Sequence, residues 1–200
     1  MSEIKVNKIK SQQGTNAYTV SSNGTITTDK HIIPPAGGII QIQYSQLTTE
    51  TTSQAISART DSVVNNFPTV NITPNSTSSK VKIDVQMFFE FGDDGSQHNH
   101  MFFLYRDSTK IGSTSSTSNT YRGIGAGTLT YDTVPNDAST PNMLYMSFFD
   151  APSTTSQITY KLGVIMNNAQ TLYINRTVAG NDAVNYERGI SFISATEISG

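Results

Sequence analysis

The fold is decided by residues 71–91, which read NITPNSTSSKVKIDVQMFFEF. A short β-branched run ends at Pro74, a polar loop follows, and apolar and polar residues then alternate. The apolar positions are Val81, Ile83, Val85, Met87, Phe89 and Phe91, and the polar positions are Lys82, Asp84, Gln86 and Glu90. Successive side chains of a β-strand point to opposite faces, so this period of two predicts a strand with one buried and one wet face. We expect the remaining strands to assemble beside it.

The composition of this 200-residue chain favours one β-rich domain with a short appendage. Charged residues make up 14% of the chain, well below the usual share of about a quarter. Ser, Thr, Asn and Gln together supply about two-fifths of it, which is above ordinary usage. A neutral, hydroxyl-rich surface of this kind is typical of extracellular β-rich proteins rather than of helical cytosolic enzymes.

Charge and cysteine content argue against several classes of function. The formal net charge is −2 and no Lys/Arg cluster occurs, so we expect no nucleic acid partner. Cysteine is absent, which leaves neither a disulfide framework nor thiol chemistry. The start, MSEIKVNKIK, lacks the apolar run of a signal peptide, and no long apolar segment follows. We therefore expect synthesis in the cytoplasm without membrane insertion.

Residues 1–33 differ from the rest, because their apolar residues are too sparse to fold alone. Asn23-Gly24 between strand-like flanks predicts a hairpin. A segment of this kind docks on another surface, winds with copies of itself, or stays a disordered tail. Residues 34–38, PPAGG, join a stiff turn to a permissive one. They separate this attachment or stalk segment from a head domain at residues 39–200.

The head domain is expected to be all-β. Turn signals separate about nine or ten short strands, which predict a two-sheet antiparallel sandwich. The expected strands lie at residues 39–44, 70–73, 81–91, 97–106, 142–149, 157–166, 171–175 and 189–198, with an irregular Gly-rich strand at 121–131 and a weakly patterned stretch at 48–59. No segment has a convincing helical period.

Three of these strands are apolar on both faces, within residues 101–105, 143–149 and 190–198. A sandwich strand normally buries one face only. The second apolar face therefore needs either a covering loop or an identical subunit. We favour the subunit, because an exposed patch of that size promotes aggregation. The long Ser/Thr loops keep the covering loop as the alternative.

Several fragments, taken in order, resemble a family of tailed-phage virion proteins found in marine and cyanobacterial phages. The fragments are MSEIKVNKI at 1–9, PAGGIIQIQYSQ at 35–46, ITPNSTSSKVKIDV at 72–85, FFLYRDSTKIG at 102–112, DAPSTTSQITYKL at 150–162, TLYINR at 171–176 and RGISFISATEIS at 188–199. The resemblance spans nearly the whole chain and is strongest in residues 70–111 and 149–198. The fragments are specific as a series, since each alone is a turn flanked by strands.

The resemblance implies a fibre-like structural protein of the virion. Residues 1–33 would attach to other virion proteins, and the head would be a jelly roll similar to the tumour-necrosis-factor and complement-C1q type that assembles as a homotrimer. The family has no shared catalytic residues, so none carries over to this chain. Its members serve as tail fibres, head fibres or capsid decoration, so the place on the particle stays open.

His98 and His100 form the candidate metal site. On a strand both imidazoles share a face, and a three-fold axis would bring six of them around one octahedral ion. A single copy beside a turn favours instead two polar residues that start a strand. Asp93-Asp94-Gly95, with Glu90 nearby, lacks the alternate oxygen ligands of a calcium loop and is explained by a hairpin turn. We expect neither a metal nor a cofactor.

The remaining candidates are charge pairs, tyrosines and glycosylation sequons. Arg106 beside Asp107 and Glu187 beside Arg188 are interpreted as turn or surface charges, not catalytic groups, and no Gly-x-Ser-x-Gly elbow occurs. Five tyrosines are candidates for stacking on sugars, although core or interface packing is their commoner fate. They are Tyr44, Tyr105, Tyr121, Tyr131 and Tyr186. The sequons at Asn71, Asn75 and Asn175 are expected by chance in so Ser/Thr/Asn-rich a chain.

Together these observations predict a trimeric, non-enzymatic virion protein that adheres to a glycan or protein of the host surface. The loops at residues 112–120, 134–141 and 178–186 are expected to face the host. One alternative is a capsid decoration or head-fibre protein that stabilises the particle without binding a receptor. Two others are a C1q-like glycan-binding module outside any phage and a depolymerase that cleaves surface glycan.

Overall fold

A computed structural model describes residues 8–10, 16–20, 23, 26–27, 34–92, 99–114, 122–126, 139–179 and 186–200. The chain divides into two compact units, Met1–Pro35 and Ala36–Gly200, and each is described by itself. All strand pairs in the described residues are antiparallel. The same residues contain no helix.

The first unit contains a small sheet in the order β1-β2-β3. Its strands are β1 (Lys8–Lys10), β2 (Asn16–Val20) and β3 (Ile26–Thr27). Strands β2 and β3 pair through Val20 and Ile26, on either side of Asn23-Gly24. The hairpin predicted from the Asn-Gly dipeptide is therefore confirmed.

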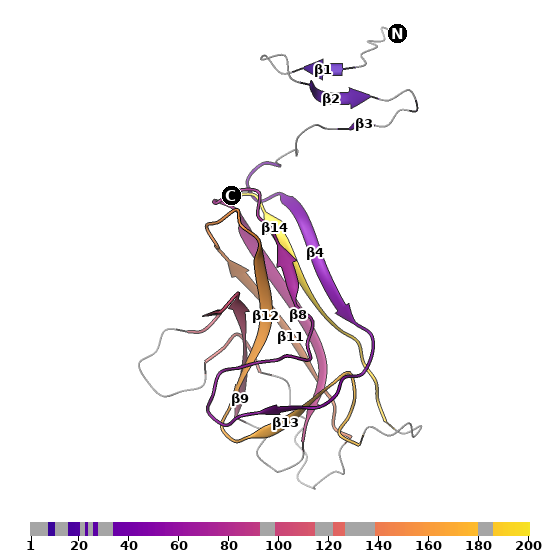
Figure 1. The fold of residues 1–200 in the computed structure, drawn as a ribbon, viewed down its shortest axis with the longest axis vertical. Coiled ribbons are helices and arrows are strands. Elements are labelled where there is room, and N and C mark those ends of the chain that lie inside the picture. Colours follow the sequence, from indigo (N-terminus) through magenta and orange to yellow (C-terminus); the bar gives the residue numbers. More distant parts are fainter. Residues whose placement is uncertain are drawn as a thin grey trace. The chain divides into compact units, whose positions relative to one another are not determined.

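The second unit is a sandwich of two antiparallel sheets (Figure 1). The six-stranded sheet contains β4 (Ile39–Leu47), β5 (Gln54–Ile56), β8 (Lys80–Phe91), β11 (Asn142–Asp150), β13 (Gln170–Ile174) and β14 (Ser191–Ile198). The five-stranded sheet contains β6 (Ser62–Val63), β7 (Val70–Ile72), β9 (His100–Arg106), β10 (Thr109–Ile111) and β12 (Ile158–Met166). The all-β, two-sheet fold expected from the sequence is confirmed.

Strand β8 organises the six-stranded sheet. It pairs with β14 along one edge and with β11 along the other, and its last residues pair with β13. Strand β4 lies beyond β14, and β5 lies beyond β13. In the other sheet β12 has β9 on one side and both β6 and β7 on the other. From β8 to β9 and from β11 to β12 the chain crosses between the sheets, as jelly-roll strands do.

The hydrophobic core lies between the inner faces of the two sheets. The alternating residues of β8 from Val81 to Phe91, which were predicted to be buried, have exposed fractions of 0 to 2%. Strand β12 faces them with Ile158, Tyr160, Leu162, Val164 and Met166. Burying each large apolar side chain stabilises the fold by about 1.5–3 kcal/mol. The period of two in the sequence therefore marks the core side of both strands.

A partly buried ion pair joins the two sheets at the ends of their strands. Arg106, the last residue of β9, donates from Nη1 to both carboxylate oxygens of Asp150 at 3.0 and 3.1 Å. The Tyr160 hydroxyl on β12 donates to Asp150 Oδ2 at 2.8 Å. Because Asp150 ends β11 in the six-stranded sheet, one carboxylate connects both layers. Burial, followed by the hydrogen bond to Asp150, raises the pKa of Tyr160 well above its usual range.

A second buried carboxylate, Glu197, ties β14 to its neighbours. It accepts hydrogen bonds from Gln41 Nε2 at 2.6 Å and from the Asn75 backbone N–H and Nδ2 at 2.6 and 2.9 Å. Burial alone raises the pKa of a carboxyl group, but these hydrogen bonds outweigh it, so the pKa of Glu197 lies below its usual value. Strand β4 and the β7–β8 loop are thereby fixed to β14.

The structure adds short strands to the sequence-based expectation, narrows one predicted stretch, and leaves parts of two predicted strands outside the described residues. Strand β6 was not predicted, because two residues are too few to show an alternation. Within residues 48–59 only β5 is a strand. Residues 97–98 of one predicted strand, and 121 and 127–131 of another, lie outside the described residues. Of the latter strand, Gly125 exchanges backbone hydrogen bonds with Phe102.

Candidate functional site

Most of the exposed large apolar side chains among the described residues lie on the outer face of the six-stranded sheet. We call it the outer sheet face and define it by one residue set from four adjacent strands. The set is Ile39, Ile42 and Tyr44 of β4, Phe192 and Ser194 of β14, Lys82, Asp84 and Gln86 of β8, and Tyr145, Ser147 and Phe149 of β11. Strand register places Phe192, Gln86 and Tyr145 in one row across the sheet.

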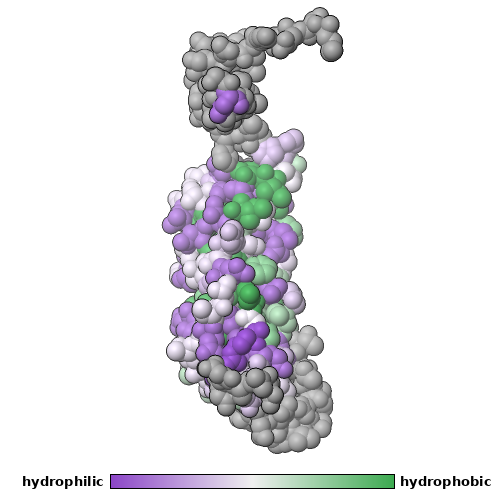
Figure 2. Space-filling view, turned by 90° about the vertical axis from the view of Figure 1, so that its right-hand side faces the viewer, coloured by the Kyte–Doolittle hydropathy of each residue, from purple (hydrophilic) through white to green (hydrophobic). Residues whose placement is uncertain are grey.

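Several large side chains on the outer sheet face project into solvent. Tyr44 is 75% exposed, Tyr145 68% and Phe149 58%, and Ile39 and Ile42 are also exposed. Figure 2 faces the side on which β4 lies in Figure 1, and apolar areas interrupt the polar surface there. Single exposed apolar residues are ordinary, whereas several on neighbouring strands of one sheet mark an interaction surface.

A groove of about 620 Å³ runs across the middle of this face. Its lining residues are Asp84, Val85, Gln86, Tyr145, Met146, Ser147, Phe192 and Ser194. Tyr145 and Phe192 come from strands on either side of β8, and the shorter Asp84 and Gln86 lie between them. The groove therefore has aromatic walls and a polar floor.

The charges of the outer sheet face neutralise each other locally. Lys82 and Asp84 are successive outward residues of β8, and Lys82 Nζ lies 2.8 Å from Asp84 Oδ1. Both side chains are about one-third exposed. A paired charge costs less to cover than an isolated one. A partner can therefore cover this part of the face without leaving either Lys82 or Asp84 as an unpaired charge.

The outer face of the five-stranded sheet is built differently. Phe103 of β9 points outward yet is fully buried, because it lies flat against Gly163 of β12. Lys110 Nζ sits 3.9 Å from its ring centroid, and the Tyr105 ring meets it edge-on at 5.3 Å. The second apolar face predicted for residues 101–105 is therefore covered at Phe103 by the chain itself. On β11 and β4 the described residues provide no such cover.

The two histidines of the candidate metal site, His98 and His100, have different outcomes. His98 lies outside the described residues. His100 is 4% exposed and starts β9, where its ring lies 5.1 Å from Phe91 and 5.4 Å from Phe102, edge-on to both. The position was interpreted as a polar residue that starts a strand, but its side chain shares the inner face with Phe102 and Leu104. That parity was visible in the sequence.

The acidic candidates are also resolved in part. Asp93 and Asp94 lie outside the described residues. Glu90 is 1% exposed, and its carboxylate accepts hydrogen bonds from Thr140 N at 2.6 Å, Thr140 Oγ1 at 2.8 Å and Val178 N at 2.7 Å. It therefore fixes two segments that approach from different parts of the chain. Among the described residues, no group of three His, Asp or Glu side chains is arranged to hold a metal ion.

In both sequence-adjacent charge pairs, Arg106 with Asp107 and Glu187 with Arg188, each side chain has a partner other than its neighbour. Arg106 binds Asp150, whereas Asp107 accepts a hydrogen bond from Thr159 N at 2.9 Å. Arg188 Nε lies 3.1 Å from Glu50, and Glu187 accepts from Ser139 Oγ at 2.9 Å. The Arg106 side chain is 28% exposed, yet it does more than a surface charge, because it joins β9 to Asp150 of the other sheet. Sequence reasoning missed Asp150, which lies 44 residues away.

The candidate tyrosines lie in different environments. Tyr44 is on the outer sheet face, and Tyr105 lies on the opposite sheet beside Phe103. Burial, and then the nearby charge of Asp61, raise the pKa of Tyr105. Tyr186 is partly buried, while Tyr121 and Tyr131 lie outside the described residues. Tyr44 and Tyr105 therefore lie on different sheets and do not share a surface.

The three sequons are not equivalent. Asn175 is 1% exposed; its Nδ2 donates to the carbonyls of Leu47 and Thr49 and its Oδ1 accepts from Ser191. Its φ of +61° is a left-handed conformation that Asn tolerates better than most residues. A side chain enclosed in this way is closed to glycosylation in the folded protein. Asn71 and Asn75 are exposed.

Comparison with protein-family models gives no match for this chain, and neither does comparison with curated proteins. Within the part of the chain that the structure describes, no helix has the length and apolar character to cross a membrane. The outer sheet face therefore carries the functional interpretation.

Proposed function

We propose that this protein is a structural component of a tailed-phage virion that assembles as a homotrimer and presents its β-sandwich head to the host surface. The observation that carries the proposal is the exposed apolar outer sheet face. A solitary head leaves Tyr44, Tyr145 and Phe149 in water. Burying each of them against a sister copy gains about 1.5–3 kcal/mol relative to exposure. The trimer and the virion come from the family resemblance, together with the closed symmetry usual in homo-oligomers.

The mechanism is adhesion without turnover. Copies of the head associate through the outer sheet face, residues 1–33 attach to other virion proteins, and the loops at residues 112–120, 134–141 and 178–186 meet a glycan or protein of the host. Neither a cofactor nor a metal takes part. The polar, hydroxyl-rich composition suits a surface that must stay soluble between binding events.

Sedimentation of the full chain at several concentrations tests the assembly. We expect a trimer for the natural sequence and a monomer for Tyr145→Glu and for Phe149→Glu, because each variant places a charge in the covered face. Lys161→Glu, on the outer face of the five-stranded sheet, is the matched control and should remain trimeric. A monodisperse monomer of the natural sequence would refute the assembly.

Binding of the labelled trimer to host cells tests the adhesion. Saturable binding that host polysaccharide competes for supports adhesion through glycan, and binding that only protease treatment of the cells removes supports a protein receptor. A trimer that binds purified capsids and not host cells would replace adhesion by capsid decoration. Release of reducing ends from host polysaccharide would replace it by depolymerase activity.

A further inference from the structure

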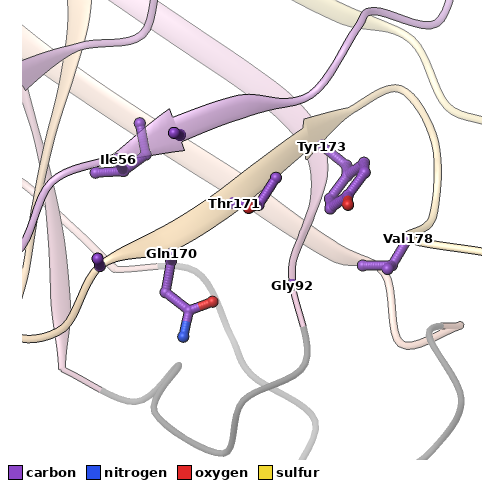
Figure 3. Close-up of a pocket in the computed structure, with 8 residues that line it drawn as sticks. Ile56, Gly92, Gln170, Thr171, Tyr173 and Val178 are labelled. Atoms are coloured by element: carbon purple, nitrogen blue, oxygen red, sulfur yellow. The ribbon is translucent and has the colours of Figure 1, made fainter.

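A second depression lies on the six-stranded sheet, where β5 and β13 run beside the end of β8 (Figure 3). Its volume is about 380 Å³, within the range of small-molecule sites. The lining residues are Ala55, Ile56, Gly92, Ala169, Gln170, Thr171, Tyr173 and Val178. None of the outer-sheet-face residues is among them, so the two surfaces are separate.

The depression exists because the strands carry small residues where they meet. Thr171 pairs with Ala55 on β5, and on the other side Gly92 donates its N–H to the Thr171 carbonyl at 2.7 Å. A Cβ on Gly92 would come no closer than 3.5 Å to Thr171, so glycine leaves space there that a larger residue would fill. Ala55, Thr171 and Gly92 form a floor of short side chains.

The aromatic wall of the depression is held in place. Tyr173 and Val178 stand together at one end, with Thr171 between them and Ile56 (Figure 3). The Arg176 guanidinium lies 5.3 Å from the Tyr173 ring centroid. The Val178 N–H donates to the buried Glu90 carboxylate at 2.7 Å. A wall fixed before binding costs little ordering when a ligand arrives.

The chemistry of the lining selects the class of ligand. None of the described lining residues is charged. Within the described residues the hydroxyl groups of Thr171 and Tyr173 make no hydrogen bond. A purely apolar ligand would leave both hydroxyls unpaired at a cost, whereas a ligand that carries hydroxyl groups and one apolar face satisfies both demands. A pyranose ring has that combination.

We propose that this depression binds one ring of a neutral saccharide. Tyr173 supplies the stacking surface on the side away from Arg176, and the hydroxyl groups of Thr171 and Tyr173 bond the sugar hydroxyls. This deepens the proposed adhesion, on which it rests only for the biological source of the sugar. Tyr173 was not among the tyrosines singled out from the sequence.

Saturation-transfer NMR on the full chain tests the site, with methyl α-glucoside, methyl β-galactoside and N-acetylglucosamine as probes. We expect at least one to bind, with a Kd on the order of 1 mM. Tyr173→Ala should weaken binding about tenfold, and Tyr173→Phe should retain most of it because the stacking ring remains. Ala55→Trp should abolish it by filling the depression, and Ala55 is exposed, so the core is left intact.

Tyr105→Ala is the matched control, since Tyr105 is a partly exposed tyrosine on the other sheet. It should bind the glycosides like the natural sequence. The inference is wrong if none of the probes binds at tens of millimolar, or if Tyr173→Ala and Ala55→Trp bind unchanged. Thermal unfolding identifies any variant that has failed to fold, and Tyr173→Phe then still reports on the site.

The inference and the proposed function fail separately. Glycoside binding that depends on Tyr173, in a protein that neither trimerises nor adheres to cells, supports the site and refutes the function. A trimer whose adhesion to host cells is unchanged in Tyr173→Ala supports the function and refutes the site as its receptor contact.

Discussion

At the scale of single residues, buried polar groups decide how the two sheets are joined. Asp150 is 8% exposed and receives a guanidinium from β9 and a phenol from β12. A buried carboxylate without partners would cost several kcal/mol, so each donor stabilises the native pairing of the layers. Arg106 lies 44 residues and Tyr160 ten residues from Asp150 in the sequence, on strands of the opposite sheet, and the folded sandwich brings the three together.

Tyr160→Phe removes one donor from Asp150 and leaves the ion pair with Arg106. We expect the free energy of unfolding to fall by about 1.5–3 kcal/mol, the value of a hydrogen bond to a charged group. Urea denaturation at fixed protein concentration measures it. Tyr105→Phe, which removes a partly exposed hydroxyl on the other sheet, should change stability by less than about 0.5 kcal/mol. Equal effects of the two variants would contradict the role given to Asp150.

Glu197 makes stability depend on pH. Its folded-state pKa lies below the unfolded value, so its contribution is present above the unfolded pKa of about 4.3 and is lost as pH falls through the folded pKa. We expect the Tm to drop between about pH 4.5 and pH 3, and Glu197→Gln to flatten this part of the profile. Glu187→Gln, at an exposed position, should keep the slope. A slope unchanged by Glu197→Gln would assign the acid sensitivity elsewhere.

At the scale of elements, strands with a clear alternation of apolar and polar residues were predictable. Very short strands, and sites that depend on which strands lie side by side, were not. Strands β8 and β12 follow the period of two almost residue for residue. Strand β6 has two residues and owes its place to Gly163 and Val164 of β12, so no local signal marks it. The parity of His100 with Phe102 would have placed it in the core. The depression beside Tyr173 depends on β5 lying next to β13, which pairing alone decides.

Glu90 of β8 joins the segment before β11 to the segment after β13, and nothing in the sequence marks these two segments as neighbours. Replacing it by Gln leaves a single acceptor oxygen for the N–H groups of Thr140 and Val178. We expect both amides to exchange with solvent about tenfold faster or more, since an unsatisfied buried donor costs about 1–3 kcal/mol. Hydrogen exchange by NMR reads each amide, and the amide of Leu162 in the core of β12 should be unaffected. Unchanged exchange at Thr140 and Val178 would show that other contacts hold these segments.

At the scale of the whole molecule, stability and assembly should be one property. If the outer sheet face is covered only in the oligomer, association favours the folded state by mass action. The Tm of the natural sequence should therefore rise with protein concentration. The Tm of Phe149→Glu should not depend on concentration, and differential scanning calorimetry over a hundredfold range of concentration distinguishes the two. A Tm independent of concentration in both proteins would contradict a subunit partner for this face.

Backbone hydrogen bonds join the first and last residues of the β-sandwich unit. Gly37 N donates to the Ser199 carbonyl at 2.7 Å, and Ser199 N donates to the Gly38 carbonyl at 2.9 Å. The start and the end of the chain within the β-sandwich unit therefore lie side by side. Circular permutation becomes feasible, with a short linker joining these ends and new termini cut at the exposed residues Thr155 and Ser156. Such a chain would offer two fusion points in the β11–β12 loop, so that a tag or cargo could be displayed there while the strand pairing of both sheets stays unchanged.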